Sequence, residues 1–352
     1  MKNRITILAL ALLLVIGCRD ETPTQPQSTL VYYVAPNATV FPESVSTTGI
    51  PYIRVRMPGE DARAGSLLDM NEAGWAVGSR GGEGRRLAVA VNVRTGHTDT
   101  LIGVDGDDTP YSFQAKAINA RGEVVGGAET IQPMSPTAFY WRDGRPTRLG
   151  LGSAMGINDN GVVVGYGQAL PLAMRPWVWR GGDLQFLGEG LGRAYGINNR
   201  GDIVGTASYS RVWKPTIWRG GVRDSISPDS GEATGINERG EIVGWAIHSG
   251  VLEAFVWRKG VRTWLGTLQA GQPSQATAIN DRGAIVGNVV MPSETHAVLW
   301  RDGRIIDLGL SGRTVPFENI SEAFGITNSG QVIGRVGQGG NRNGVIWTPP
   351  PR

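Results

Sequence analysis

Residues 235–244 read GINERGEIVG, and this pattern decides the fold because it recurs along the chain. The pattern is a small residue, an aliphatic residue, Asn, two variable residues, Gly, a variable residue, two aliphatic residues and Gly. The first copy, DMNEAGWAVG at 69–78, is more divergent, and the last copy has Thr in place of Asn. We number seven copies, repeats 1 to 7, by their third residue: Asn71, Asn119, Asn158, Asn198, Asn237, Asn280 and Thr327. Successive copies are 39 to 48 residues apart. A period near 40 predicts one small structural unit per repeat.

A second landmark follows each motif by about twenty residues. Repeats 2 to 7 carry a tryptophan there, namely Trp141, Trp179, Trp218, Trp257, Trp300 and Trp347, whereas repeat 1 carries Val91. In five repeats Arg and a Gly turn follow the Trp. Asn-x-x-Gly and Trp-Arg-x-Gly each favour a tight hairpin, so a repeat should hold four short strands. We expect the Asn residues to form turns, the tryptophans to pack between repeats, and the arginines to reach water.

The expected fold is all-β, a seven-bladed β-propeller of four-stranded repeats of about 40 residues. Near-continuous aliphatic runs such as VVVG predict strands buried on both faces, as in stacked blades. Repeat 7 has only three strands before the chain ends at Arg352. Residues 50–57 (IPYIRVRM) are therefore expected to supply its outer strand and close the ring; residues 30–35 (LVYYVA) are a weaker rival.

The N-terminus predicts export and a lipid anchor. Residues 1–4 are cationic and residues 5–16 are apolar, too few to span a bilayer. The sequence Val-Ile-Gly-Cys at 15–18 resembles the lipobox of bacterial lipoproteins, which implies cleavage before Cys18 and lipidation of this only cysteine. The predicted organisation is a signal peptide at 1–17, Cys18 with a polar tether to 48, and the propeller at 49–349. Arg19 does not resemble the inner-membrane retention signal, which favours the outer membrane or cell surface.

Composition excludes several classes of protein. Gly and Pro make up 72 of 352 residues and 40% of residues are hydrophobic, which argues against disorder, collagen and coiled coil. Without Lys2 and Arg4 the chain has 32 basic and 31 acidic residues, too balanced for a nucleic-acid-binding protein. A single cysteine allows no internal disulfide.

The repeats resemble the bacterial extracellular HAF repeat family over roughly residues 65–348. The shared features are the GIN-x-x-G-x-VVG core and an A-F-x-W strand, seen here as AFVW at 254–257, with a Asp-Leu-Gly tail at 307–309. The resemblance implies a secreted, propeller-like repeat protein without an established activity.

Binding residues are expected on the face of the long, dissimilar connections, because loops on a rigid scaffold carry function. In a meander, the two tight turns of each repeat lie at one end and the remaining connections at the other. Candidates just past each motif's last Gly are Tyr166, Trp245, Asn288 and Arg335, with Arg85, Arg86, Tyr209, Trp213 and His248 as a second group. Exposed aromatic rings beside Arg suit sugar stacking or a protein contact. For Tyr166 and Trp245, packing between blades is an equal alternative.

No catalytic, cofactor or metal motif emerges. His97, His248 and His296 are too far apart to suggest zinc, and the acidic loop Asp105-Gly-Asp107-Asp108 lacks a full calcium-loop pattern. We therefore expect no metal, no cofactor and a non-enzymatic binding or scaffolding module for an extracellular protein or polysaccharide. The alternative is a propeller hydrolase or lyase, which needs two carboxylates about 5–10 Å apart; the available ones are Glu83, Glu129, Glu253 and Glu294. A purely structural envelope protein is a third possibility.

Overall fold

Every element in the described part of the chain is a β-strand. The computed structural model describes residues 40–42, 52–55, 65–81, 86–101, 112–129, 137–170, 173–309, 319–338 and 341–348, and within them there is no helix. Consequently no helix in these ranges could cross a membrane. The predicted signal peptide, Cys18, the rival strand at 30–35 and the acidic loop at 105–108 lie outside the described residues.

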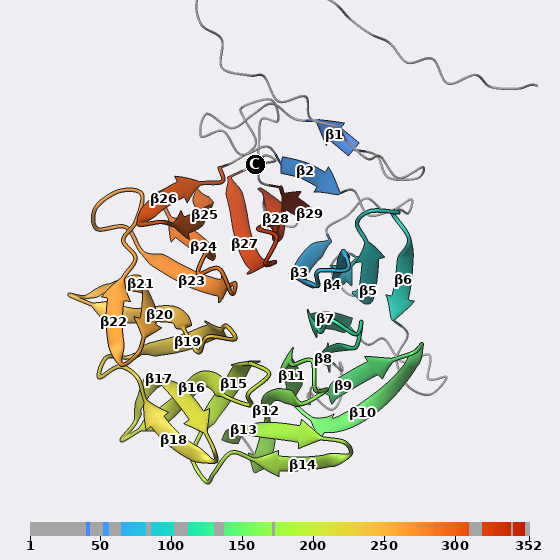
Figure 1. Ribbon diagram of the computed structural model, residues 1–352, viewed down its shortest axis with the longest axis vertical. Coiled ribbons are helices and arrows are strands. Elements are labelled where there is room, and N and C mark those ends of the chain that lie inside the picture. The colour runs from blue at the N-terminus through green and yellow to red at the C-terminus, as the bar shows by residue number, and fades with distance from the viewer. Residues whose placement is uncertain are drawn as a thin grey trace, which may run out of the picture. The chain divides into compact units, whose positions relative to one another are not determined.

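Repeats 1 to 5 each form a four-stranded antiparallel sheet in which sequential strands are neighbours (Figure 1). Repeat 1 has β3 (Ser66–Met70), β4 (Trp75–Arg80), β5 (Leu87–Asn92) and β6 (Thr98–Leu101). Repeat 2 has β7 (Ser112–Ile118), β8 (Val124–Glu129), β9 (Thr137–Arg142) and β10 (Arg145–Leu151). Repeat 3 has β11 (Ser153–Ile157), β12 (Val163–Leu170), β13 (Ala173–Arg180) and β14 (Asp183–Phe186). Repeat 4 has β15 (Gly192–Ile197), β16 (Ile203–Tyr209), β17 (Val212–Arg219) and β18 (Val222–Ser225). Repeat 5 has β19 (Gly231–Ile236), β20 (Ile242–His248), β21 (Val251–Arg258) and β22 (Val261–Trp264).

Repeats 6 and 7 share a nine-stranded sheet. Repeat 6 contributes β23 (Ser274–Ile279), β24 (Ile285–Val290), β25 (Thr295–Arg301) and β26 (Arg304–Asp307). Repeat 7 contributes β27 (Ile320–Ile326), β28 (Val332–Gln338) and β29 (Asn341–Trp347), and one parallel pair, Thr295 with Ile320, joins the two sets. Strand β2 (Tyr52–Val55) lies within the predicted closing segment and pairs antiparallel with β29. The outer edge of β2 offers unpaired backbone groups, and strand β1 (Val40–Pro42) pairs with it. Part of the segment interpreted as a tether is therefore a strand.

The first strands of the repeats lie nearest the middle of Figure 1, and each contacts the first strand of the next repeat. Strand β3 also contacts β27 of repeat 7. Each first strand ends at the motif Asn or Thr, which begins the turn to the second strand. The side chain forms this turn as expected: Asn158 Oδ1 accepts from the backbone N–H groups of Asn160 (3.1 Å) and Val162 (3.0 Å).

The same asparagines also join neighbouring repeats. Asn158 Nδ2 donates to the carbonyl of Asn198 at 2.9 Å, and five other motif asparagines make the same bond at 2.9 to 3.2 Å, ending at the carbonyl of Thr327. A second series runs beside it, in which the residue after the Asn accepts from the equivalent N–H of the preceding repeat; for example, Asp281 Oδ1 accepts from Glu238 N–H at 2.8 Å. We call these two series the inner and outer belts.

Each belt has one missing link, at a different side of repeat 1. Thr327 has no amide to donate to Asn71, and Ala120 has no side-chain acceptor for Glu72. Across the first gap, Asn328 N–H donates to the Glu72 carboxylate; across the second, Asn71 Nδ2 donates to the Asn119 carbonyl at 3.0 Å. Repeat 1 is therefore held by one belt bond on each side, while each pair of successive repeats from 2 to 7 is joined by two.

The core lies between successive sheets. Trp347 packs in a cluster that includes Val286 and Leu299 of repeat 6, and Trp218 packs with Val164 and Val178 of repeat 3. Trp300 and Trp347 are buried like Trp218, whereas Trp141, Trp179 and Trp257 are half-buried against similar clusters. The tryptophans thus pack between repeats, as predicted.

The arginines after the tryptophans are exposed, as expected, and three of them also contact a carboxylate of their own repeat. In repeats 2, 4 and 5 a carboxylate at the turn lies between two arginines; Asp202 contacts Arg200 and Arg219, each at 3.0 Å. Burial raises the pKa of Asp202, but hydrogen bonds from Arg219 and Arg200 outweigh it and leave the pKa below its usual value. Since Arg219 comes from the second turn, this contact confirms that both turn types share one end of the sheet, which we call the turn end.

At the opposite end, which we call the mouth, two of the predicted long connections are in fact short. Strands β16 and β17 continue to a two-residue turn at Ser210 and Arg211, and β20 and β21 to a turn at Ser249 and Gly250. All four residues have positive φ, between 49° and 82°, which suits the right-handed twist of a two-residue hairpin. The prediction of long loops after Gly205 and Gly244 was wrong, because the flanking residues pair in register.

Candidate functional site at the mouth

Seven cross-strand pairs define the mouth of the first hairpins. In every repeat the residue five before the motif Asn or Thr lies opposite the residue eight after it, on the first and second strands. The pairs are Ser66 with Ser79, Gln114 with Gly127, Ser153 with Tyr166, Arg193 with Thr206, Glu232 with Trp245, Gln275 with Asn288, and Glu322 with Arg335. We call these the mouth pairs. Directly opposed residues project from the same face of a sheet, so each pair presents two side chains together.

Repeats 3 to 5 bring three of these side chains and one neighbour into contact. Tyr195, on β15, donates from its hydroxyl to Glu232 Oε1 at 3.1 Å. The Arg193 guanidinium carbon lies 5.3 Å from the centre of the Tyr166 ring. Arg193 Nε is enclosed and has no hydrogen-bond partner within the described residues. The cluster therefore combines aromatic faces, an Arg donor and a carboxylate.

The acid–base properties of this cluster are shifted by burial. Burial raises the pKa of Glu232, although Tyr195 and Arg193 oppose the shift. Burial and the nearby Glu232 charge raise the pKa of Tyr195, and a hydrogen bond with Tyr195 raises that of Arg193. Near pH 7 Tyr195 is thus a neutral hydroxyl and Arg193 a fixed cation.

A second group lies in repeat 7. Arg335 Nε donates to Glu322 Oε2 of its own mouth pair, and the Arg335 guanidinium carbon lies 5.1 Å from the centre of the Phe324 ring. Both charged side chains are about one-fifth exposed, so the ion pair is partly shielded from water. In repeat 2, Lys116 donates to Ser153 Oγ at 2.8 Å, which links repeat 2 to the mouth pair of repeat 3.

The structure places the predicted binding residues in different surroundings. Tyr166, Trp245 and Arg335 belong to mouth pairs and are half-buried. Asn288 is buried, and its Oδ1 accepts from the Ala323 N–H of the next repeat at 2.9 Å, so its side chain joins two repeats. Tyr166 contacts Arg193 of the next repeat, which fits the alternative of packing between blades as well as that of ligand contact.

The second group of predicted residues lies further along the hairpins. Tyr209 and Trp213 flank the β16–β17 turn, and His248 precedes the β20–β21 turn. The His248 ring stacks on Trp264 with centroids 4.4 Å apart, and its Nδ1 lies 2.7 Å from Glu253. Arg86 is exposed and Arg85 lies outside the described residues.

The described histidines and their carboxylate partners form three separate groups, and His296 contacts two carboxylates, Glu294 and Asp307, each at 2.9 Å. Glu253 contacts His248, and Glu294 contacts His296 at 2.9 Å, while Glu83 and the side chain of Glu129 lie outside the described part of the chain. His97 contacts Asp99. Among the described residues, no three His, Cys, Asp or Glu side chains are arranged to hold a metal ion.

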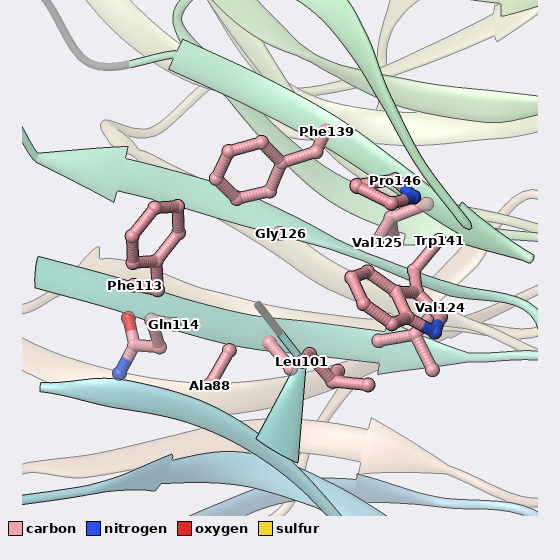
Figure 2. Close-up of a pocket in the computed structure, with 11 residues that line it drawn as sticks. Ala88, Leu101, Phe113, Gln114, Val124, Val125, Gly126, Phe139, Trp141 and Pro146 are labelled. Carbon is pink, nitrogen blue, oxygen red and sulfur yellow. The ribbon is translucent and has the colours of Figure 1, made fainter. Parts of the chain in front are cut away.

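A small apolar crevice lies between the sheets of repeats 1 and 2. Figure 2 shows Phe113 and Phe139 on one side of it and Trp141 with Pro146 on the other. The two phenylalanine rings stack with centroids 5.2 Å apart. Gln114 alone brings a polar side chain to the lining, so the crevice offers apolar packing rather than chemistry.

Sequence reasoning missed Arg193, Tyr195, Glu232 and Glu322, which lie before the motif on the first strand. The available signal was variation: in the position five before the Asn or Thr every repeat has a polar residue, but its identity changes from Ser to Gln, Arg or Glu. The residue that follows it is always Ala or Leu. A polar residue next to such a small or aliphatic position marks a strand face that is not part of the core.

Comparisons with solved structures support a β-propeller fold. A structure described in a study of two prolyl endopeptidases matches with a TM-score of 0.53 at 9% identity, covering 90% of this chain and 51% of that one. A puromycin hydrolase matches with a TM-score of 0.52 at 14% identity, covering 86% and 57%. The acylaminoacyl peptidase of Pyrococcus horikoshii matches with a TM-score of 0.51 at 12% identity, covering 86% and 56%.

The chain spans little more than half the length of these three proteins. At such low identities the likeness concerns the fold alone. No protein-family model matches the sequence, and no curated protein matches it.

Proposed function

We propose that the chain is an exported, lipid-anchored, seven-bladed β-propeller that binds an extracellular ligand at its mouth. The observation that carries the proposal is the contrast within one hairpin. The turn end repeats the same Asn chemistry in six of seven copies, whereas the mouth pairs differ in every repeat and gather Arg, Glu, Tyr and Trp side chains. A scaffold needs uniform bonds, while a binding surface needs a particular set of groups.

Three contacts support seven blades in a closed ring. Strand β27 of repeat 7 lies against β3 of repeat 1, and Asn328 donates to Glu72 across the same junction. Strand β2 adds a fourth strand to the three of repeat 7 and covers the outer edge of β29. The HAF-like motifs and the propeller likeness of solved structures agree with this arrangement.

Export and anchoring rest on the sequence at residues 1–18. Lipidation of Cys18 would place the propeller at the outer membrane or cell surface. Metabolic labelling with palmitate tests it: the wild-type chain should be labelled and fractionate with membranes, and Cys18→Ser should abolish the label. Equal labelling of the variant would contradict the anchor.

The binding site is tested with the chain from residue 19 on an array of bacterial and plant polysaccharides and immobilised envelope proteins. The matched variant combines Arg193→Ser with Glu232→Ser, because repeat 1 has Ser66 and Ser79 at its mouth pair. We expect a wild-type signal that the double variant loses, with unchanged thermal unfolding. A signal that survives the double variant would show that the ligand does not bind at these mouth residues. No signal at all would favour the purely structural envelope protein.

A propeller hydrolase or lyase is the second candidate, and one observation favours it. Glu232 is a carboxyl group with a raised pKa beside Tyr195 and Arg193, which suits a general acid. Release of reducing ends from the bound polysaccharide, abolished by Glu232→Gln, would establish the enzyme. Binding of the polysaccharide without turnover would favour the binding module over the enzyme.

A further inference from the structure

The end of the β16–β17 hairpin in repeat 4 is exposed on both faces. Val212, opposite Tyr209, is 41% exposed, and the next residue, Trp213, is 38% exposed on the other face. Leu191, also exposed, lies on the other side of Ser208 from Trp213, and its carbonyl accepts from Ser208 N–H. Since successive residues of a strand face opposite sides, exposure on both means that the hairpin end extends past its neighbours.

Three cations surround this end. The Arg223 guanidinium carbon lies 4.5 Å from the centre of the Tyr209 ring, and Lys214 Nζ lies 5.9 Å from it. Arg211 forms the turn itself and is exposed. Within the described residues none of the three has a carboxylate partner. Nearby, Glu189 is held by Arg175 at 3.3 Å, and Asp224, next to Arg223 on β18, projects from the other face of the sheet.

The equivalent hairpin of repeat 5 lacks this free charge. Gly250 takes the place of Arg211, and Glu253 takes the place of Lys214. Arg262, which corresponds to Arg223, is neutralised by Asp229 at 2.7 Å. Unpartnered positive charge is thus a property of repeat 4, not of the repeat design.

Arg211 also occupies a costly backbone conformation. Its φ is +71°, a region that favours glycine, and Gly250 has φ +82° at the same place in repeat 5. A non-glycine residue in this region costs roughly 1 kcal/mol or more. Strain of this kind concentrates at functional sites. A role for the Arg211 side chain would therefore explain why this position is not a glycine.

We propose that the hairpin end formed by Val212, Lys214, Arg211 and Arg223 on Tyr209 is a docking surface for an acidic polypeptide segment that also carries apolar side chains. The cations, two of them oriented by the Tyr209 ring, pair with carboxylates, and Val212 and Trp213 are covered by the apolar side chains. An anionic glycan would satisfy the cations but would leave Val212 and Leu191 exposed. This surface is separate from the mouth pairs and does not depend on their ligand.

The test uses fluorescence anisotropy with a fluorescein-labelled twelve-residue peptide that repeats Glu-Glu-Leu-Glu, and the chain from residue 19. The key variant combines Arg211→Gly with Lys214→Glu, because repeat 5 folds with these residues at the same positions. We expect saturable binding that high salt weakens and that the double variant weakens at least tenfold, while its thermal unfolding temperature is unchanged or higher. Trp213→Ser should weaken binding several-fold.

Two controls decide the interpretation. Arg282→Glu reverses an exposed charge at the turn end and should bind the peptide as the wild type does. A peptide with Lys in place of Glu should not bind. Equal binding by the double variant, or by the Lys peptide, would overturn the proposal. Oligogalacturonate that binds more tightly than the peptide, with the same sensitivity to the double variant, would replace the polypeptide with an anionic glycan.

Discussion

The two ends of the first hairpins differ in what their side chains do. At the turn end, Asn158 uses its oxygen within its own turn and its amide on the next repeat, and four other motif asparagines do both in the same way. At the mouth, the Arg193–Tyr195–Glu232 cluster and the Arg335–Glu322 pair each occur once. Uniform bonds at one end free the other end to vary, because a fixed register holds the mouth pairs in place.

The largest effect on stability should come from removing β2, which pairs with β29 of repeat 7. A chain that begins at residue 58 loses the partner of β29, whereas one that begins at residue 49 keeps it. We expect the shorter chain to lose about 4 kcal/mol of unfolding free energy and to self-associate through the exposed edge. Denaturant titration and light scattering measure both. Equal stability of the two chains would mean that β2 does not close the ring.

The inner belt comes next. Asn158→Ala removes one bond to the Asn198 carbonyl and two within the turn, and leaves buried backbone groups unpaired. We expect a loss of about 3 kcal/mol in urea unfolding. The control is Asn160→Ala, an exposed residue with one bond to the Asn199 carbonyl, which should cost well under 1 kcal/mol. Similar losses would show that the belt is not what distinguishes the turn end.

The paired carboxylates should have a smaller, pH-dependent effect. Asp202→Asn breaks the contacts with Arg200 and Arg219 and should cost about 2 kcal/mol at pH 7. Because the pKa of Asp202 is lowered in the folded state, its contribution is present above the unfolded pKa and is lost as the pH falls through the folded pKa. The stability gap between wild type and variant should therefore close below about pH 4. A gap that is independent of pH would assign the effect to packing.

Completing the inner belt should stabilise the protein slightly. Thr327→Asn supplies the amide that repeat 7 lacks toward the Asn71 carbonyl, and should add about 0.5–1 kcal/mol. Ser329→Asn, in the same turn, is the control: it replaces the hydroxyl that lies 2.7 Å from the Thr327 hydroxyl and supplies no belt bond to repeat 1, so it should not stabilise the protein. A destabilised Thr327→Asn variant would mean that the junction with repeat 1 has a different geometry from the other six.

The smallest effect is expected at the mouth. Glu322→Ser with Arg335→Ser installs the residues that repeat 1 carries at the same pair, Ser66 and Ser79. Because a partly exposed ion pair adds little, the change should stay within about 0.5 kcal/mol by thermal and chemical unfolding. A loss as large as that of Asn158→Ala would make the mouth part of the scaffold and erase the contrast between the two ends.

Local chemistry explains which features were predictable. Asn-x-x-Gly specifies its turn through bonds spanning two to four residues, so Asn158 could be assigned to a hairpin from sequence alone. Its bond to Asn198, 40 residues away, could not, because it depends on how neighbouring sheets are spaced. For the same reason Asn288 was taken for a ligand contact, whereas it joins two repeats.

By itself, the sequence determined the repeat period, the strand-rich architecture, both kinds of turn and the packing of the tryptophans, since periodicity and turn chemistry act over a few residues. Tertiary structure alone decided the two belts and their gaps at repeat 1, the carboxylates between arginines, and the contact of Tyr195 with Glu232. It also decided that, among the described residues, Arg211, Lys214 and Arg223 of repeat 4 have no carboxylate partner while Arg262 of repeat 5 has Asp229. These features need residues from different turns or different repeats to meet, which only the register and packing of the sheets can fix.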